Sequence, residues 1–174
     1  MPTPLFHLVL HRPEIPNNTG NIGRTAVATG CSLHLIRPLA FDTSEKACRR
    51  AGLDYWARLN PMEHDSLDAY LDHASRAEQE PRLWFFTTRT ERVAHDVDLF
   101  PGDHLVFGSE TAGLPRGVLD RFPARTVRLP MVANERSLNL ATAVCAAVYL
   151  GIDQLLRRGQ LTVGPGATLS RPVR

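Results

Sequence analysis

The sequence predicts an α/β domain built on a mostly parallel sheet with helices on both faces. Short apolar runs typical of buried strands alternate along the chain with segments of helical composition. The length of 174 residues suits one domain, and no internal repeat is apparent. Polar loops follow three of the apolar runs, and ligands in this class of sheet bind beyond the carboxyl ends of the strands.

The strands are predicted from short runs rich in leucine, valine, isoleucine and phenylalanine, each bounded by residues that favour turns. The first run, LFHLVL, precedes a loop with two prolines and two asparagines, and the last run stops at Pro130. In chain order the predicted strands are residues 5–10, 33–36, 83–87, 105–107 and 127–129.

The helices are predicted from their composition and from residues that favour helix ends. Asn18 or Thr19 would cap the first helix, Gly30 would end it, and Ser66 would cap the third. The last helix is the longest and is rich in alanine, valine and leucine. In chain order the predicted helices are residues 20–29, 44–51, 66–74, 116–122 and 137–158.

The segment from Gly159 onward is rich in glycine, proline and serine and has little pattern, so we expect it to be disordered. The predicted organisation is therefore a folded domain over residues 1–158 and a flexible tail over residues 159–174.

Composition excludes several classes of protein. No uninterrupted apolar run approaches the roughly 20 residues of a membrane helix, and the N-terminus lacks a secretory signal, so we expect a cytoplasmic protein without a membrane span. The three cysteines are widely spaced, no CxxC pair occurs and the seven histidines are scattered, so we expect neither a disulfide framework nor a metal.

The charged residues give only a weak indication of whether the protein binds nucleic acid. The net charge of +2 does not by itself indicate a nucleic-acid-binding protein. Lys46 is the only lysine, and arginine offers a planar fork of donors suited to phosphate. A GC-rich genome would produce the same bias toward arginine, so both explanations stay open.

The loop after residues 105–107 is GSETAGLP. Gly108 and Gly113 would let a ligand approach the backbone closely. The loop is neither GxGxxG nor a P-loop, so a nucleotide-like ligand here would lack phosphates, which favours S-adenosylmethionine over NAD or ATP. The alternative is a plain turn in which Glu110 is a solvated charge.

The loop over residues 130–140 leads directly into the longest helix. Met131 and Leu138 could hold a flat adenine ring between them, and free N–H groups at the helix start could bind its polar edges. The alternative makes Asn134 or Ser137 an ordinary N-cap and places Met131 and Leu138 in the core.

The loop over residues 16–25 places Asn21 and Arg24 three residues apart, on one face of the first helix. A phosphate or carboxylate is a plausible partner for Arg24, and a solvated arginine is the alternative.

Together these loops resemble a known family. PNNTGNIGR, LVFGSETAGLP and LPMVANERSLNLATAV resemble the three signature motifs of SPOUT 2′-O-ribose methyltransferases, in the same order. RRAGLDYW, at residues 49–56, resembles the small-domain subgroup called YibK-like or TrmL-like. The resemblance extends to about residue 158. Ala141 departs from it, because relatives often have serine there.

The resemblance implies an α/β fold with a C-terminal trefoil knot that holds S-adenosylmethionine. It implies a catalytic role for Asn139, which would arrange the reacting end, and for Arg24, which would face the ribose hydroxyl as a base or as an electrostatic stabiliser. A guanidinium stays protonated, which favours the second role. The residues expected to bind the cofactor are Phe86, Gly108, Glu110, Gly113, Leu129, Met131, Ser137 and Leu138.

The resemblance also implies the partners. The substrate would be tRNA, with leucine tRNA expected, methylated at the wobble ribose on C or modified U. A homodimer is expected, with Tyr149 near the interface or the RNA. The alternatives are ribose methylation at another tRNA or rRNA position, or an RNA-binding module without catalysis. The candidate phosphate contacts are Arg12, Arg49, Arg50, Arg89 and Arg136.

Overall fold

The computed structural model describes residues 3–77 and 80–171 and shows a six-stranded sheet. Every neighbouring pair in this sheet is parallel, and the strand order is β3-β2-β1-β5-β4-β6. The predicted α/β fold is therefore confirmed, while the knot stays a prediction. The strands are β1 (His7–His11), β2 (Ser32–Ile36), β3 (Met62–His64), β4 (Leu83–Phe86), β5 (His104–Phe107) and β6 (Thr126–Val127).

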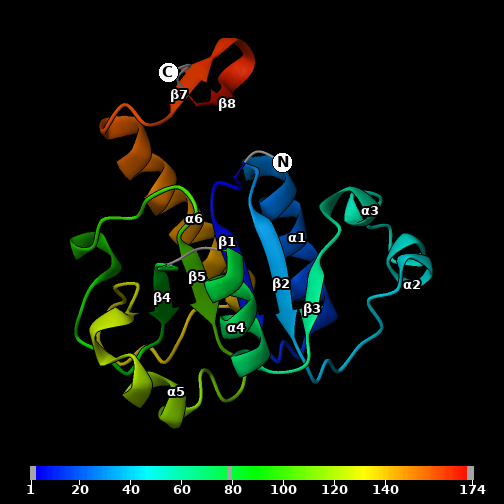
Figure 1. The fold of residues 1–174 in the computed structure, drawn as a ribbon, viewed down its shortest axis with the longest axis horizontal. Helices are drawn as coiled ribbons and strands as arrows, with labels where there is room; N and C mark the ends of the chain where they lie inside the picture. Colours follow the sequence, from blue (N-terminus) through cyan, green and yellow to red (C-terminus); the bar gives the residue numbers. More distant parts are fainter. Residues whose placement is uncertain (1–2, 78–79, 172–174) are drawn as a thin grey trace.

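Helices cover both faces of the sheet (Figure 1). α1 and α6 pack on one face over Leu8 and Leu105, and α4 and α5 pack on the other over Val9 and Val106. This two-sided cover explains why the central strands consist of near-continuous apolar runs. The α-helices are α1 (Pro16–Thr29), α2 (Glu45–Arg50), α3 (Trp56–Leu59), α4 (Leu67–Ala77), α5 (Arg116–Arg121) and α6 (Leu140–Arg157).

The first helix starts earlier than predicted, at Pro16. Proline has no N–H to leave unpaired and its φ suits the first helical turn, so it begins this helix rather than extending the loop. Asn18 and Thr19 are buried inside the helix and are not its caps, because Ile15 occupies the N-cap position without a side-chain bond. Gly30 ends the helix in the left-handed conformation at φ 71°, as predicted.

The last helix starts later than predicted, at Leu140. Asn139 is the N-cap, and its Oδ1 accepts hydrogen bonds from the N–H groups of Ala141 and Thr142 at 2.9 and 3.2 Å. Neither Asn134 nor Ser137 is therefore the cap. Residues 137–139 lie in the loop, where their side chains can face a ligand.

In addition to the strands of the tail, the short elements β3 and α3 were not predicted, because each has only three or four residues. β6 is also shorter than predicted and ends at Val127, although Arg128 continues it as an isolated bridge to Val93.

Helix α6 is long enough to cross a membrane and has a mean hydropathy of 1.3. In this fold it is a core helix with seven buried residues. Its Gly151 lies so close to β1 that a Cβ there would be 2.5 Å from the Phe6 ring. Of its other residues, six are half-buried and five are exposed.

The tail also differs from the prediction. Residues 162–170 form an antiparallel hairpin of β7 (Thr162–Gly164) and β8 (Thr168–Ser170), which extends from the end of α6 (Figure 1). The expectation of disorder is wrong for these residues, because the glycines and the proline form the turn of a hairpin. Arg171 donates hydrogen bonds to the carbonyls of Thr3 and Pro4 at 2.8 and 3.0 Å. Flexibility of this hairpin relative to the domain stays a prediction.

Candidate active site

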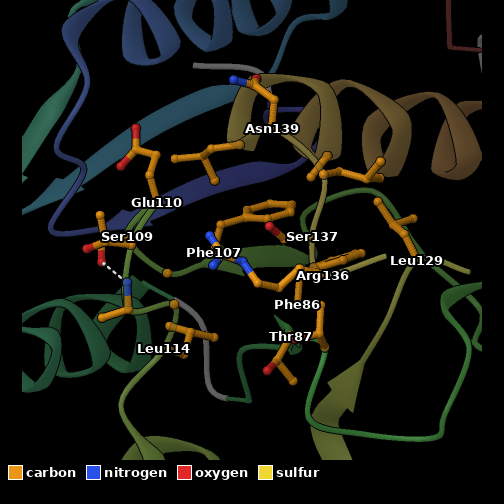
Figure 2. A pocket seen from close by; sticks show the side chains of 18 of the residues that line it. Phe86, Thr87, Phe107, Ser109, Glu110, Leu114, Leu129, Arg136, Ser137 and Asn139 are labelled. Atoms are coloured by element: carbon orange, nitrogen blue, oxygen red, sulfur yellow. Dashed lines mark hydrogen bonds between the residues drawn. The ribbon is translucent and has the colours of Figure 1, made fainter. Parts of the chain in front are cut away.

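A cavity of about 540 Å³ opens beyond the carboxyl ends of β4 and β5 (Figure 2). The loops after β4 and β5, the segment before α6 and the start of α1 all line it. This is the edge of the sheet where ligands bind in this class of fold. The predicted site residues that line it are Phe86, Gly108, Glu110, Gly113, Leu129, Met131, Ser137, Leu138 and Asn139.

Part of the cavity wall is apolar and flat. The rings of Phe86 and Phe107 stack with their centroids 4.6 Å apart. Leu129 and Met131 extend this surface, and Leu138 is 41% exposed rather than part of the core. The core interpretation of Leu138 is therefore wrong, and the wall offers the apolar contacts that an adenine ring needs.

The loop after β5 turns back on itself at Gly108. A Cβ there would lie 2.0 Å from the Gly113 carbonyl carbon and 2.2 Å from the Leu114 nitrogen, which excludes any side chain. The Gly113 N–H closes the turn by donating to the Ser109 carbonyl at 2.9 Å, with Gly113 at φ 67°. The two glycines therefore let the loop present its backbone to the cavity.

Glu110 is held by the protein and is not a solvated charge. Its carboxylate accepts hydrogen bonds from the N–H groups of Glu14 and Ile15 at 2.8 and 3.2 Å, and from the Asn18 amide at 3.0 Å. These bonds fix the start of α1 against the loop after β5. This geometry favours a positioning role over direct contact with a cofactor.

Asn18 links Glu110 to Asn139. The Asn139 amide donates to Asn18 Oδ1 at 2.9 Å, while Asn139 Oδ1 caps α6. Hydrogen bonds thus join all three motif loops through this buried asparagine. Asn18 was missed as a site residue, since the sequence pattern suggested only a helix cap, although it lies within the PNNTGNIGR motif.

Arg24 does not line this cavity. It is exposed on α1, with its guanidinium carbon 4.7 Å from the centroid of the Tyr55 ring. Burial raises the pKa of Tyr55 despite the nearby Arg24 cation, so its hydroxyl stays protonated and donates to the Gly20 carbonyl. Arg24 instead lines a neighbouring cavity of about 510 Å³ between α1 and α6. Asn139 lines both cavities and connects them.

The candidate phosphate contacts are divided between cavities. Arg136 lines the 540 Å³ cavity, and Arg12 lines a second cavity of about 590 Å³. Arg89 lines both cavities. Arg50 is exposed at the end of α2, and the side chain of Arg49 lies outside the described part of the structure. Among residues 3–77 and 80–171, no group of three or more His, Cys, Asp or Glu side chains is arranged to hold a metal ion.

The chain is similar in sequence to a described family and to named enzymes. The model of the SpoU rRNA Methylase family matches residues 5–149. A tRNA (cytidine(34)-2'-O)-methyltransferase of Saccharophagus degradans is 43% identical over 152 residues, which cover 87% of this chain and 96% of that protein. The enzyme of the same name from Burkholderia ambifaria is 47% identical over 146 residues, covering 83% of this chain and 92% of that protein.

Solved structures are similar as well. One, described as giving structural insights into the 2-OH methylation of C/U34 on tRNA, superposes with a TM-score of 0.80 at 45% identity, over 89% of this chain and 99% of that one. The SpoU methyltransferase AviRb of Streptomyces viridochromogenes in complex with AdoMet gives a TM-score of 0.76 at 26% identity, over 90% of this chain and 63% of that one.

Proposed function

The chain belongs to the SpoU rRNA Methylase family, and we propose that it transfers a methyl group from S-adenosylmethionine to the ribose 2′-hydroxyl of nucleotide 34 of tRNA. The observation that carries this proposal is the convergence of the three motif loops on one cavity, in a chain 43–47% identical to enzymes named for that reaction. We further propose C or modified U as the base, leucine tRNA as a substrate and the cytoplasm as the location.

The cavity fits the cofactor. The apolar wall at Phe86, Leu129 and Met131 suits adenine, and the tight turn at Gly108, where a Cβ would collide with the Gly113 and Leu114 backbone, places backbone groups along the cavity. Backbone groups at Gly108 and Leu129 would hold the polar edges of the ligand, with Ser137 and Leu138 completing the wall. When bound, S-adenosylmethionine supplies a methyl carbon made electrophilic by the adjoining sulfonium.

The chain's own residues would position and activate the hydroxyl. Asn139, fixed by its bonds to Asn18 and to the first turn of α6, would orient the reacting end. The guanidinium of Arg24 would hold the adjoining phosphate and stabilise negative charge that develops on the ribose oxygen. Positioning of this kind can supply roughly 7–11 kcal/mol of the barrier.

The function is tested by supplying methyl-tritiated cofactor with unmodified leucine tRNA and with a copy already methylated at the wobble ribose. We expect incorporation into the first RNA only, with mass spectrometry placing the label at nucleotide 34. Equal incorporation into both would show that the target lies elsewhere in the tRNA. Ribosomal RNA is supplied in a parallel reaction, and its labelling with no labelling of either tRNA would exclude leucine tRNA as the substrate.

Replacing Gly108 by valine is expected to weaken cofactor binding by at least about 100-fold, which corresponds to ~2.7 kcal/mol. The Cβ would collide with the backbone at Gly113 and Leu114, so the loop must move away from its ligand-binding position. Isothermal titration calorimetry with S-adenosylmethionine measures the effect. Gly117→Ala is the control, because a Cβ at this exposed position meets nothing within 4 Å. Unchanged affinity in Gly108→Val would place the cofactor elsewhere.

We also propose that the protein is a homodimer formed through α1 and α6. Exposed positions on the two helices form one surface with a cavity in it, lined by small side chains such as Ala28 and Ala141. Tyr149 on this surface is 55% exposed. Exposed aromatic side chains of this kind are enriched at the centres of protein interfaces.

Light scattering at micromolar concentration is expected to give twice the monomer mass of 19.3 kDa. Ala146→Arg should shift the mass toward the monomer, because it places an unpaired charge on the exposed face of α6. Ala124→Arg, at an exposed position outside α1 and α6, should not shift it. A wild-type mass of 19.3 kDa would reject the dimer.

A further inference from the structure

A second cavity of about 590 Å³ lies against the loop after β5 and is formed also by the segments that follow β1 and β2. Arg89, Ser109, Ala112, Gly113 and Leu114 line both this cavity and the proposed cofactor cavity, so a single loop separates the two. Whatever binds here therefore lies beside the proposed cofactor cavity.

His11 is the buried polar group of this second cavity. It is the last residue of β1 and only 8% exposed, and its Nδ1 has no hydrogen-bond partner in the part of the chain that the structure describes. Burial, with a smaller effect from the Arg12 cation, lowers the pKa of His11, so the imidazole is neutral at pH 7. A neutral imidazole offers one donor and one acceptor, the combination found on the edges of nucleobases.

Two arginines make the second cavity positive. Arg12 is exposed and adopts a left-handed backbone with φ 54°, held by its N–H bond to the Ile36 carbonyl at 3.0 Å. Arg89 donates only long bonds of 3.4 and 3.5 Å to backbone carbonyls, which leaves it available for a phosphate. The carboxylate of Glu14 accepts hydrogen bonds from Thr111 at 2.8 and 3.2 Å, so its charge is already partnered.

Most of the remaining lining is apolar and includes Pro13, Pro38 and Leu39. An apolar lining suits the faces of a planar ring, and sequence-specific recognition of single-stranded RNA works on bases turned out of the stack. We propose that the second cavity binds the base of a nucleotide next to the methylated one, with His11 bonding the base edge and Arg12 and Arg89 holding its phosphate. This proposal rests on the proposed function.

The test combines RNA lacking a single base with variants of the second cavity. Unmodified anticodon stem-loops are made intact, and with an abasic nucleotide immediately before or immediately after nucleotide 34. Each RNA is methylated by the wild type, by His11→Ala, by Ala40→Trp and by Ala124→Trp. Ala40 is exposed and lines only the second cavity, so tryptophan fills it without disturbing the core. Ala124 is exposed and lies away from it.

For the wild type and Ala124→Trp we expect one of the two abasic RNAs to raise KM about tenfold, the usual consequence of losing one base contact. His11→Ala and Ala40→Trp should raise KM for intact RNA by a similar factor. For these two variants, removing the base from the RNA should cause no further rise in KM, and their affinity for S-adenosylmethionine should stay unchanged.

Two failures are distinguishable. An abasic penalty of the same size in all four proteins, or in none of them, overturns the assignment of the second cavity while leaving methylation of nucleotide 34 intact. Absence of wild-type methylation at nucleotide 34 in intact RNA overturns the proposed function, and the assignment with it.

Discussion

Arg24→Ala is expected to slow methyl transfer by about 10²–10³-fold in kcat while leaving the affinity for S-adenosylmethionine unchanged. Arg24 lines the cavity between α1 and α6 and not the proposed cofactor cavity, so its removal leaves the cofactor contacts in place. What is lost is a fixed positive charge next to Asn139, where the ribose and its phosphate would lie. Single-turnover methylation of tRNA and calorimetry of cofactor binding measure the two quantities separately.

Arg24→Lys should recover little of the rate, because lysine keeps the charge but lacks the planar fork that holds a phosphate bidentately. The matched control is Arg116→Ala, which removes another exposed arginine, from α5, and should leave the rate unchanged. Near-normal turnover by Arg24→Ala would reject its role in transfer. A large loss of cofactor affinity would instead place Arg24 in the cofactor site.

The buried strands were predictable because their signal is local. β1, β2, β4 and β5 are mostly buried on both faces, since helices cover both sides of the sheet. β3, with the sequence MEH, lies at the edge of the sheet and has only partial burial, so its composition gave no strand signal. Pro16 misled the prediction of α1, because proline favours both loops and first helical turns.

The site was predictable as three loops but not as a network. The order of the motifs, together with the tendency of ligands to bind beyond the carboxyl ends of parallel strands, indicated which loops line the cavity. They did not indicate that Glu110 bonds to residues near the start of α1, or that Asn18 connects it to Asn139, because those bonds join residues more than 90 positions apart. The separation of Arg24 from the cofactor cavity likewise depends on how α1 packs against α6.

Scattered histidines also meet in the fold, and this has a consequence for stability. On the face covered by α4, His7 Nδ1 lies 3.1 Å from His34 Nε2, and His34 Nδ1 lies 3.1 Å from His64 Nε2. The His7 and His104 rings stack with their centroids 4.3 Å apart, and the Tyr70 hydroxyl of α4 bonds to His104 Nδ1. This histidine cluster joins four strands and a helix, with His73 of α4 beside it.

The free energy of unfolding is therefore expected to fall steeply below about pH 6.5. Burial, followed by the neighbouring histidines, lowers the pKa of His34 to about 2, and burial with a smaller effect of His73 lowers that of His104 to about 4. The pKa of His64 is lowered by burial and by His73, with Asp65 opposing. Because these values lie below the ordinary value near 6.5, the unfolded chain binds more protons throughout this window. Stability is fully present above about pH 6.5 and is lost as pH falls toward 4, by roughly 1.4 kcal/mol per pH unit for each of His34 and His104.

Urea unfolding at a series of pH values between 7.5 and 4.5 measures this slope, and His34→Gln isolates the contribution of the cluster. Glutamine can still hydrogen-bond but does not titrate, so the variant's stability should depend on pH less steeply, by up to about 1.4 kcal/mol per pH unit. His95→Gln removes an exposed histidine outside the cluster and should keep the wild-type slope. The comparison uses slopes, so a uniform loss of stability from the substitution does not affect it. Parallel curves for the wild type and His34→Gln would show that protonation of His34 does not limit stability in acid.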